Sequence, residues 1–335
     1  MSILSAKDLT VGYRKGNSTS PVISGLNLSL SRGKLVALIG ANGIGKSTLL
    51  RTLVGNQPPL EGEVSISGIR IGEISRKNLS LLLGIVNTER TQAGALTVRE
   101  VVSLGRQPYT GFLGILSKND KSIVEKAMQD AGILHKASSF LAELSDGERQ
   151  KVMIAKALAQ CTPIIILDEP TAFLDVASRM ETMLLLHNLA HKQNKAVLLS
   201  SHDLSQSMML ADELWVVTND QKIISGNTED VVLSGAMDSI FASSIISFDL
   251  LQGDFCINLD SQYDIKLNCN DKILKKWIGN ALKRNGYGIS NDEACKNEIT
   301  AISPNEITVS TAQGSIKANS ISDMIAIIKG KSTNQ

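Results

Sequence analysis

An octapeptide near the N-terminus has the composition of a phosphate-binding loop. Residues 40–47 read GANGIGKS and fit the pattern G-x-x-x-x-G-K-[ST]. Glycines at this spacing let successive backbone N–H groups converge on phosphate oxygens, and a helix that begins here adds a partial positive charge. Lys46 is expected to reach the β- and γ-phosphates, and the Ser47 hydroxyl to ligate Mg²⁺. The candidate nucleotide-contacting residues are Asn42, Gly43, Ile44, Gly45, Lys46, Ser47 and Thr48.

Two adjacent carboxylates, Asp168 and Glu169, follow a short apolar run. A carboxylate at this place can hold Mg²⁺, directly or through water, because this ion prefers hard oxygen ligands. Its neighbour Glu169 can polarise a water for attack on a γ-phosphate. Phosphoryl transfer needs mainly positioning and charge stabilisation. Because the same chain contains a phosphate loop, we favour a role for Asp168 and Glu169 in Mg²⁺ binding and water activation. The alternative is a solvated carboxylate pair that caps the end of a strand.

Residues 144–150, LSDGERQ, predict a second helix N-terminus. Ser145 and Glu148 fit the capping-box pattern S-x-x-E, and Gly147 permits a close approach of the backbone to a ligand. Such a helix end can also meet a phosphate. Taken alone, a capping box strongly favours an ordinary capped helix.

A histidine, His202, ends another apolar run in the sequence SSHD. An imidazole there could contact a γ-phosphate or order the attacking water. A single histidine is more often structural, but its place at a strand end beside the phosphate loop favours a role in the chemistry.

Three short apolar runs are expected to position these groups. Residues 34–40, 163–170 and 196–203 are too short for typical helices and rich in Val, Ile and Leu, which suits strands buried on both faces of a parallel sheet. An α/β core that binds its ligand at the carboxyl ends of the strands is therefore expected. Helical patterns cover residues 46–54, 97–104, 120–131, 145–160, 176–191 and 204–211.

Composition excludes several other classes of protein. The chain has 335 residues, 43% hydrophobic and 20% charged, which predicts about two globular domains. Lys and Arg total 34 against 33 Asp and Glu, a balance that argues against nucleic acid as the partner. Four cysteines without a CxxC pair indicate no disulfide framework. Without a signal-like segment or a spanning apolar run, we expect a cytosolic chain unless a partner holds it at a membrane.

The character of the sequence changes near residues 240–254. We predict a nucleotide-binding domain over residues 1–245, with a helical subdomain at about 97–160, and a small α+β domain of unknown role over residues 250–335. In the latter we expect a strand at 263–267, a helix at 272–284, a hairpin of 306–310 with 315–318, and a last helix at 323–329 capped by Ser322.

The helix at 272–284 is expected to bury one apolar face in the core of this small domain. A ligand pocket lined by this face is the less favoured alternative. As a separate possibility, three cysteines of the same region could gather around a metal, although their spacing is wide. The predicted buried face is Leu274, Trp277, Ile278, Ala281 and Leu282, and the cysteines are Cys256, Cys269 and Cys295.

The order of motifs GANGIGKS, LSDGERQ, IIILDEP, FLD and SHD resembles the ATP-binding subunits of ABC transporters, over residues 1 to about 240. The resemblance implies a P-loop NTPase of ABC type that hydrolyses Mg-ATP in a head-to-tail homodimer. In that dimer Ser145 and Gly147 of one subunit cap the ATP bound to the other. Asp175 matches an aspartate that communicates across the interface, and Tyr13 matches an aromatic that stacks on adenine.

Two positions depart from the family pattern. Asp146 stands where the family most often has Gly, which is a mild change. The family also has a Gln between the phosphate loop and the helical subdomain, where this chain reads IVNTERTQ over residues 85–92. Thr88 lies at the expected place, and Glu89 or Gln92 could serve instead.

Residues 97–114, TVREVVSLGRQPYTGFLG, are similar to the subfamily that serves importers of ferric siderophores, haem and cobalamin. This similarity implies a membrane permease as partner, indirectly a substrate-binding protein, and a peripheral place on the cytoplasmic face of the inner membrane. Two alternatives stay open: an ABC ATPase acting on nucleic acid or ribosomes, and a slow nucleotide-gated regulatory module.

Overall fold

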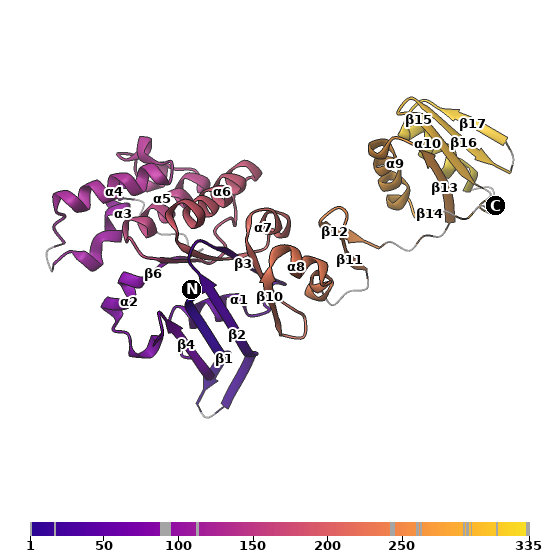
Figure 1. The fold of residues 1–335 in the computed structure, drawn as a ribbon. Helices are drawn as coiled ribbons and strands as arrows, with labels where there is room; N and C mark the ends of the chain where they lie inside the picture. The colour runs from indigo at the N-terminus through magenta and orange to yellow at the C-terminus, as the bar shows by residue number, and fades with distance from the viewer. Residues whose placement is uncertain are drawn as a thin grey trace. The chain divides into compact units, whose positions relative to one another are not determined.

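The computed structural model describes residues 2–16, 18–87, 95–111, 114–241, 245–258, 261, 263–290, 292, 295, 297–312 and 314–332. The chain divides into two compact units (Figure 1). Unit 1 comprises Met1–Ser243 and Phe248–Phe255, and unit 2 comprises Ser244–Ser247 and Cys256–Gln335. Among the described residues, no helix combines the length and the apolar character that crossing a bilayer requires.

A six-stranded sheet forms the centre of unit 1, and it contains all three strands that the apolar runs predicted. Five neighbouring strands run parallel to one another, and the sixth, an edge strand, pairs antiparallel with its neighbour. The order is β10 (Ile223–Asn227), β9 (Glu213–Val217), β3 (Leu35–Gly40), β8 (Ala196–Ser201), β7 (Ile164–Leu167) and β6 (Leu83–Val86).

Both faces of this sheet are covered, which explains why its strands are apolar at successive positions. Every residue of β3 and β8 is buried. Ala37 and Ile39 pack toward the helical side, whereas Val36 and Leu38 pack toward the other side with helix α1 (Lys46–Leu53). Alternate side chains of a strand point to opposite faces, so both faces must be apolar.

The second sheet of unit 1 is antiparallel, in the order β2-β1-β4-β5, and the sequence reading did not anticipate it. Its two long strands pair with several register shifts, which interrupt the alternation of polar and apolar residues that marks a strand. The strands are β1 (Ser2–Lys15), β2 (Ser18–Ser31), β4 (Glu61–Ile66) and β5 (Ile69–Arg70), and helix α2 (Arg76–Leu82) precedes β6.

The predicted helices of unit 1 are present, with ends shifted by a few residues. Helices α3, α4 and α5 pack on one another and each begins with a capping box, at Thr97, Ser117 and Ser145 (Figure 1). The bounds are α3 (Val98–Ser103), α4 (Lys118–Asp130), α5 (Asp146–Ala159), α6 (Val176–Gln193), α7 (Leu204–Leu210) and α8 (Thr228–Leu233).

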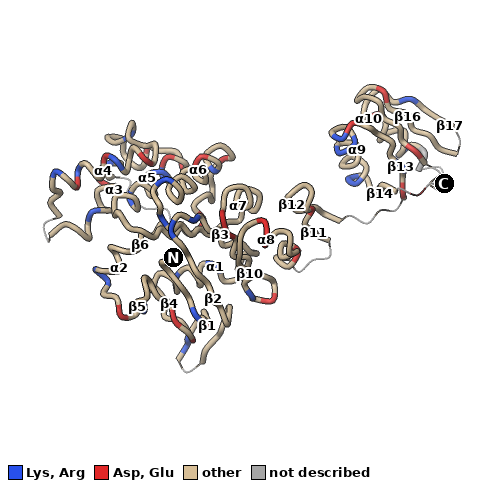
Figure 2. Tube along the Cα trace, in the orientation of Figure 1, with Lys and Arg blue, Asp and Glu red and all other residues tan. Residues whose placement is uncertain are grey.

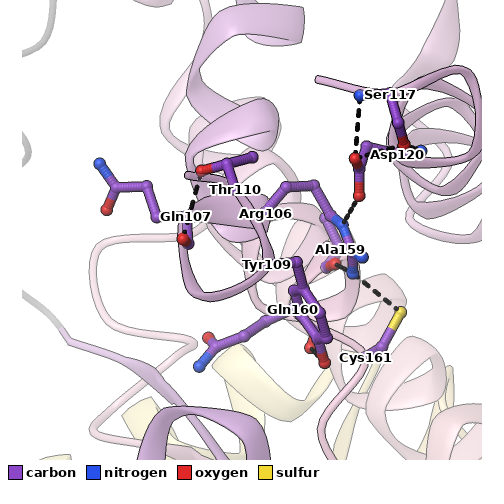
Figure 3. Close-up of polar contacts among 9 residues, drawn as sticks. All are labelled: Arg106, Gln107, Tyr109, Thr110, Ser117, Asp120, Ala159, Gln160 and Cys161. Atoms are coloured by element: carbon purple, nitrogen blue, oxygen red, sulfur yellow. Dashed lines mark hydrogen bonds and ion pairs between the residues drawn. The ribbon is translucent and has the colours of Figure 1, made fainter. Parts of the chain in front are cut away.

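A buried ion pair joins the segments of this helical region (Figure 3). Arg106, which follows α3, donates from Nε to the Asp120 carboxylate of α4 at 2.9 Å and from Nη1 to the carbonyl of Ala159 in α5 at 2.8 Å. Its guanidinium lies 3.8 Å from the centre of the Tyr109 ring. Asp120 also accepts the N–H and O–H of Ser117. The pair is therefore hydrogen-bonded on both sides, as a buried charge requires.

A short hairpin, β11 (Ile246–Asp249) with β12 (Asp254–Ile257), follows the last helical turn of unit 1. Phe255 meets Phe241 and Phe248 edge-to-face, each with ring centres 5.1 Å apart. The Phe248 N–H donates to the Asp238 carboxylate at 2.7 Å. These contacts anchor the tip of the hairpin to the apolar core of unit 1.

Unit 2 is an α+β fold with its own core, and it contains the predicted hairpin as β16 and β17. Its sheet has the order β14-β13-β15-β16-β17. The elements are β13 (Tyr263–Cys269), α9 (Lys272–Arg284), β14 (Tyr287–Ser290), β15 (Glu298–Ser303), β16 (Glu306–Thr311), β17 (Gly314–Ala318) and α10 (Ile321–Ser332).

Two details of unit 2 differ from the sequence reading. Trp277 is 59% exposed, whereas the other four residues of the predicted buried face are buried. At about 100° per residue, Trp277 points past the edge of that face and lies beside Ile273. The last helix begins at Ile321, and Ser320 rather than Ser322 accepts the N–H of Asp323, at 3.0 Å.

Candidate nucleotide-binding site

The loop of residues 40–47 leads from β3 into α1, as its motif requires. Gly43 and Gly45 have φ values of 75° and 115°, which glycine adopts without the strain of a side chain. Lys46 is 5% exposed, and its ammonium donates to the carbonyls of Gly40 at 2.8 Å and Ala41 at 3.0 Å. Burial lowers the pKa of Lys46, and the negative charges of Glu169 and Asp168 act in the opposite direction.

The Asp168 carboxylate lies opposite the first turn of α1. Its Oδ1 is 3.4 Å from the Ser47 hydroxyl and accepts the Ser200 hydroxyl at 2.6 Å. Two ligands in adjacent corners of a Mg²⁺ octahedron are about 3 Å apart, since each lies about 2.1 Å from the ion. Mg²⁺ completes its shell with water and phosphate oxygens. Ser47 and Asp168 therefore fit the expected Mg²⁺ site.

Glu169 and His202 meet beside these groups. The Glu169 carboxylate contacts His202 Nε2, and the Glu169 N–H donates to the Ser200 hydroxyl at 2.8 Å. Glu169 has a φ of 48°, a left-handed conformation that costs a non-glycine residue on the order of 1–3 kcal/mol and is common at functional sites. The backbone and both side-chain partners thus hold Glu169 at the end of β7.

Tyr13 joins the N-terminal sheet to this loop. Its hydroxyl lies 2.9 Å from the Thr48 hydroxyl, while 52% of the residue is exposed. The bond fixes the tyrosine next to α1 and leaves its ring open to a flat ligand. The loop residues Asn42 and Gly43 are exposed, and Ile44 is half-buried.

Comparisons with known proteins identify the family. Residues 23–172 match the family described as ABC transporter. An ABC transporter ATP-binding protein of Methanocaldococcus jannaschii is 38% identical over 71% of this chain and 81% of its own length. The chain belongs to the family of ABC transporter ATP-binding proteins. It is therefore an ATPase with a P-loop cassette.

Three further similarities bear on this ABC ATPase. The iron(3+)-hydroxamate import ATP-binding protein of Bacillus subtilis is 33% identical over 72% of this chain and 88% of its own length. The dimeric structure of a bacterial ABC transporter cassette is similar with a TM-score of 0.59 and 27% identity, over 67% of this chain and 98% of that one. Residues 264–329 match the family described as iron ABC transporter C-terminal domain.

The LSDGERQ segment of this ABC cassette forms the predicted capped helix end. Ser145 accepts the Glu148 N–H at 3.3 Å, and its own N–H donates to the Glu148 carboxylate at 2.9 Å, which lowers the pKa of Glu148. The unusual Asp146 occupies the first turn of α5, where a negative charge suits the helix dipole, 3.7 Å from Arg149.

A second helix end lies against this one. Asp175 caps α6 and accepts the N–H of Ser178 at 2.8 Å, which together with the Ser178 hydroxyl lowers the pKa of Asp175. A Cβ at Gly147 would lie 2.7 Å from the Ser178 hydroxyl. Glycine at position 147 therefore allows α5 and α6 to approach closely within a single chain.

The structure adds two residues that the sequence reading missed. Ser200 bridges Asp168 and Glu169, and its signal was a fully buried hydroxyl in an apolar strand. Asp254 of β12 lines a cavity of about 410 Å³ together with Glu169, His202 and Arg179. No local pattern marks Asp254, because only the docking of the hairpin brings it there.

Two further predictions concern the residue that replaces the missing Gln and a possible metal site formed by cysteines. Thr88, Glu89 and Gln92, the candidates for the missing Gln, lie outside the described residues. The gathering of Cys256, Cys269 and Cys295 around a metal is wrong: over the described parts of the chain, no three His, Cys, Asp or Glu residues are grouped to hold one. All four cysteines are free thiols.

Proposed function

We propose that this chain is the ATP-hydrolysing subunit of an importer for ferric siderophores. The observation that carries the substrate class is the match of residues 264–329 to a C-terminal domain of iron ABC transporters. The relative named for iron(3+)-hydroxamate import supports it. Haem and cobalamin, which the sequence resemblance also included, are the alternative cargoes of the same class.

In the proposed site, the backbone amides of residues 42–48 and the ammonium of Lys46 bind the β- and γ-phosphates of ATP. Lys46 would exchange its bonds to Gly40 and Ala41 for bonds to phosphate oxygens. Ser47 and Asp168 would hold Mg²⁺, which when bound neutralises charge on the phosphate oxygens. The Tyr13 ring would stack on adenine.

Glu169 orients and deprotonates the attacking water in this proposal. The water oxygen bonds to the γ-phosphorus as the bond from that phosphorus to the β–γ bridging oxygen breaks, which gives ADP and phosphate. His202 holds the Glu169 carboxylate in the described structure and would contact the γ-phosphate once ATP is present. In this proposal the rate of ATP hydrolysis comes from the positioning of the protein's side chains around the reacting atoms, and no covalent intermediate forms.

The proposed working unit is a head-to-tail homodimer on the cytoplasmic face of the inner membrane. Ser145 and Gly147 of one copy would cap ATP on residues 43–48 of the other, with Asp175 at the interface. The partners would be the subunits of a membrane permease and, through them, a substrate-binding protein. The near-neutral charge of the chain supports the absence of nucleic acid among them.

The experiment that tests this proposal is purification of the tagged chain from its own cells in mild detergent, with identification of the proteins that accompany it. A polytopic permease is the expected companion, and its binding protein then supplies a chelate for affinity measurements. Copurification with ribosomes or nucleic acid, or stimulation of turnover by either, would instead favour the non-transport ATPase. A chain with no companion and no Mg-dependent turnover would favour the regulatory module.

A further inference from the structure

Helix α9 of unit 2 exposes an apolar pair next to the face that it buries in the core. Leu274, Ile278 and Leu282 are buried in the cluster of unit 2. Beyond the edge of this buried face, Trp277 is 59% exposed and Ile273 is 72% exposed. Residues four apart lie next to each other on a helix surface, so these two side chains form one continuous apolar row.

The same helix carries an unusual concentration of positive charge. Its 13 residues, KILKKWIGNALKR, include five cations and no acid, although the net charge of the whole chain is only +1. Figure 2 shows the Lys and Arg positions along α9. Within the described residues none of the five forms an ion pair. They are Lys272, Lys275, Lys276, Lys283 and Arg284.

The cations and the apolar row are adjacent on the exposed side. At about 100° per residue, Lys272, Lys276 and Lys283 lie within about 40° of one another around the helix axis. Arg284 projects between the directions of Ile273 and Trp277 by the same count. The exposed side of α9 therefore presents a basic row beside an apolar row.

The uncovered side of the neighbouring sheet has the composition of an ordinary solvent-facing surface. Most of its outward positions on β13, β15, β16 and β17 are polar, and an apolar one is Ile302 of β15, which is 70% exposed. Polar examples are Lys266, Asn268, Thr300, Thr308 and Lys317. A large exposed aromatic beside unpaired cations is thus a local property of α9 and needs its own explanation.

We propose that the exposed side of α9 docks onto an anionic phospholipid bilayer. The cations match lipid phosphates in charge, and tryptophan favours the boundary between headgroups and acyl chains. Lysine stems can lie along apolar surface while their charged ends reach the headgroups. A second copy of α9 would oppose cation with cation, and a nucleic-acid backbone would satisfy the cations but leave Ile273 in water.

The test uses the full chain and needs neither ATP nor a permease, so its failure is distinct from failure of the proposed function. The probes are vesicles of phosphatidylglycerol with phosphatidylcholine and vesicles of phosphatidylcholine alone. We expect co-sedimentation with the anionic vesicles only, with a blue shift of tryptophan emission and protection from iodide. Because the other tryptophan, Trp215, is 1% exposed, the change in emission reports Trp277.

Matched variants locate the surface. K276Q/K283Q is expected to weaken vesicle binding about 30-fold, because each lysine near an anionic membrane contributes about fivefold. K118Q/K121Q removes two exposed lysines from α4 of unit 1 and should bind as the unchanged chain does. Far-UV circular dichroism and thermal melts, compared with those of the unchanged chain, check that both variants are folded. Absence of binding at low salt, equal loss in both variants, or an equal emission change with soluble polyglutamate would overturn the proposal.

Discussion

At the residue scale, Ser200 ties together the two carboxylates that follow β7. Its hydroxyl donates to Asp168 and accepts the N–H of Glu169, and His202 holds the Glu169 carboxylate from β8. Each of these carboxylates, which we propose to act in ATP hydrolysis, is therefore held by a neighbouring side chain. Preorganised groups cost no rearrangement in the transition state, which is where electrostatic catalysis gains most.

The Glu169→Gln substitution tests the proposed water-orienting role. The amide keeps the shape of the side chain but cannot accept a proton, so we expect turnover to fall at least about tenfold while ATP binding persists. Steady-state phosphate release and equilibrium binding of a fluorescent ATP analogue separate the two effects. Lys46→Ala provides the contrast, because this substitution should reduce the affinity for ATP, whereas Glu169→Gln should leave ATP binding intact. Near-normal turnover in Glu169→Gln would remove this residue from the role.

At the element scale, the Arg106 cluster explains how a region of short helices keeps a fixed arrangement (Figure 3). The side chain of Arg106 is only 5% exposed and connects the turn after α3 to both α4 and α5. Removing one member of a buried pair leaves the other without compensation, which is far more costly than losing a surface pair. The stability of the helical region should therefore depend on Asp120.

We expect Asp120→Asn to lower the melting temperature by several degrees at neutral pH. The Ser117 hydroxyl and then the Arg106 guanidinium hold the pKa of Asp120 below its ordinary value. A carboxyl whose pKa is lower in the folded state stabilises the fold above its unfolded pKa of about 3.9 and loses this contribution as the pH falls through the folded value. The difference from the unchanged protein should therefore shrink below about pH 4.

Asp130→Asn is the control on the same helix. Asp130 pairs with Lys126 at 3.2 Å, but that lysine side chain is 73% exposed, and surface pairs contribute little. Thermal melts of the three proteins from neutral to acidic pH compare the two pairs directly. Equal effects of the two substitutions, or a difference that does not change with pH, would contradict the account of Asp120.

The sequence predicted elements best where one local rule was sufficient. The strands β3, β7 and β8 are buried on both faces, so their composition alone marked them, and a capping-box pattern marked the start of α5. The long strands β1 and β2 escaped because their bulges break the alternation. Trp277 was misplaced because helical periodicity gives a direction for each residue but not the edge of the surface that packing covers.

At the scale of the whole molecule, the two units have separate cores. The two buried clusters of unit 1 are formed by residues up to Phe248, with Phe255 packed against one of them, and the cluster of unit 2 begins at Ile265. The groups proposed to bind ATP lie in unit 1, and the exposed side of α9 lies in unit 2. We therefore propose that nucleotide chemistry and the α9 surface are separable properties of one chain.

A chain of residues 1–258 tests that separation. It retains the β11–β12 hairpin, including the bond from the Asn258 N–H to the Ile245 carbonyl, and both cores of unit 1. We expect it to fold, to bind ATP with unchanged affinity and to gain about 2.7 kcal/mol of stability when ATP is present at 100 times its Kd. Its binding to anionic vesicles should be lost. Thermal melts with and without ATP, together with co-sedimentation, measure both properties. Loss of ATP binding by this chain would show that unit 2 completes the nucleotide site, and retained vesicle binding would move the lipid contact from α9 to unit 1.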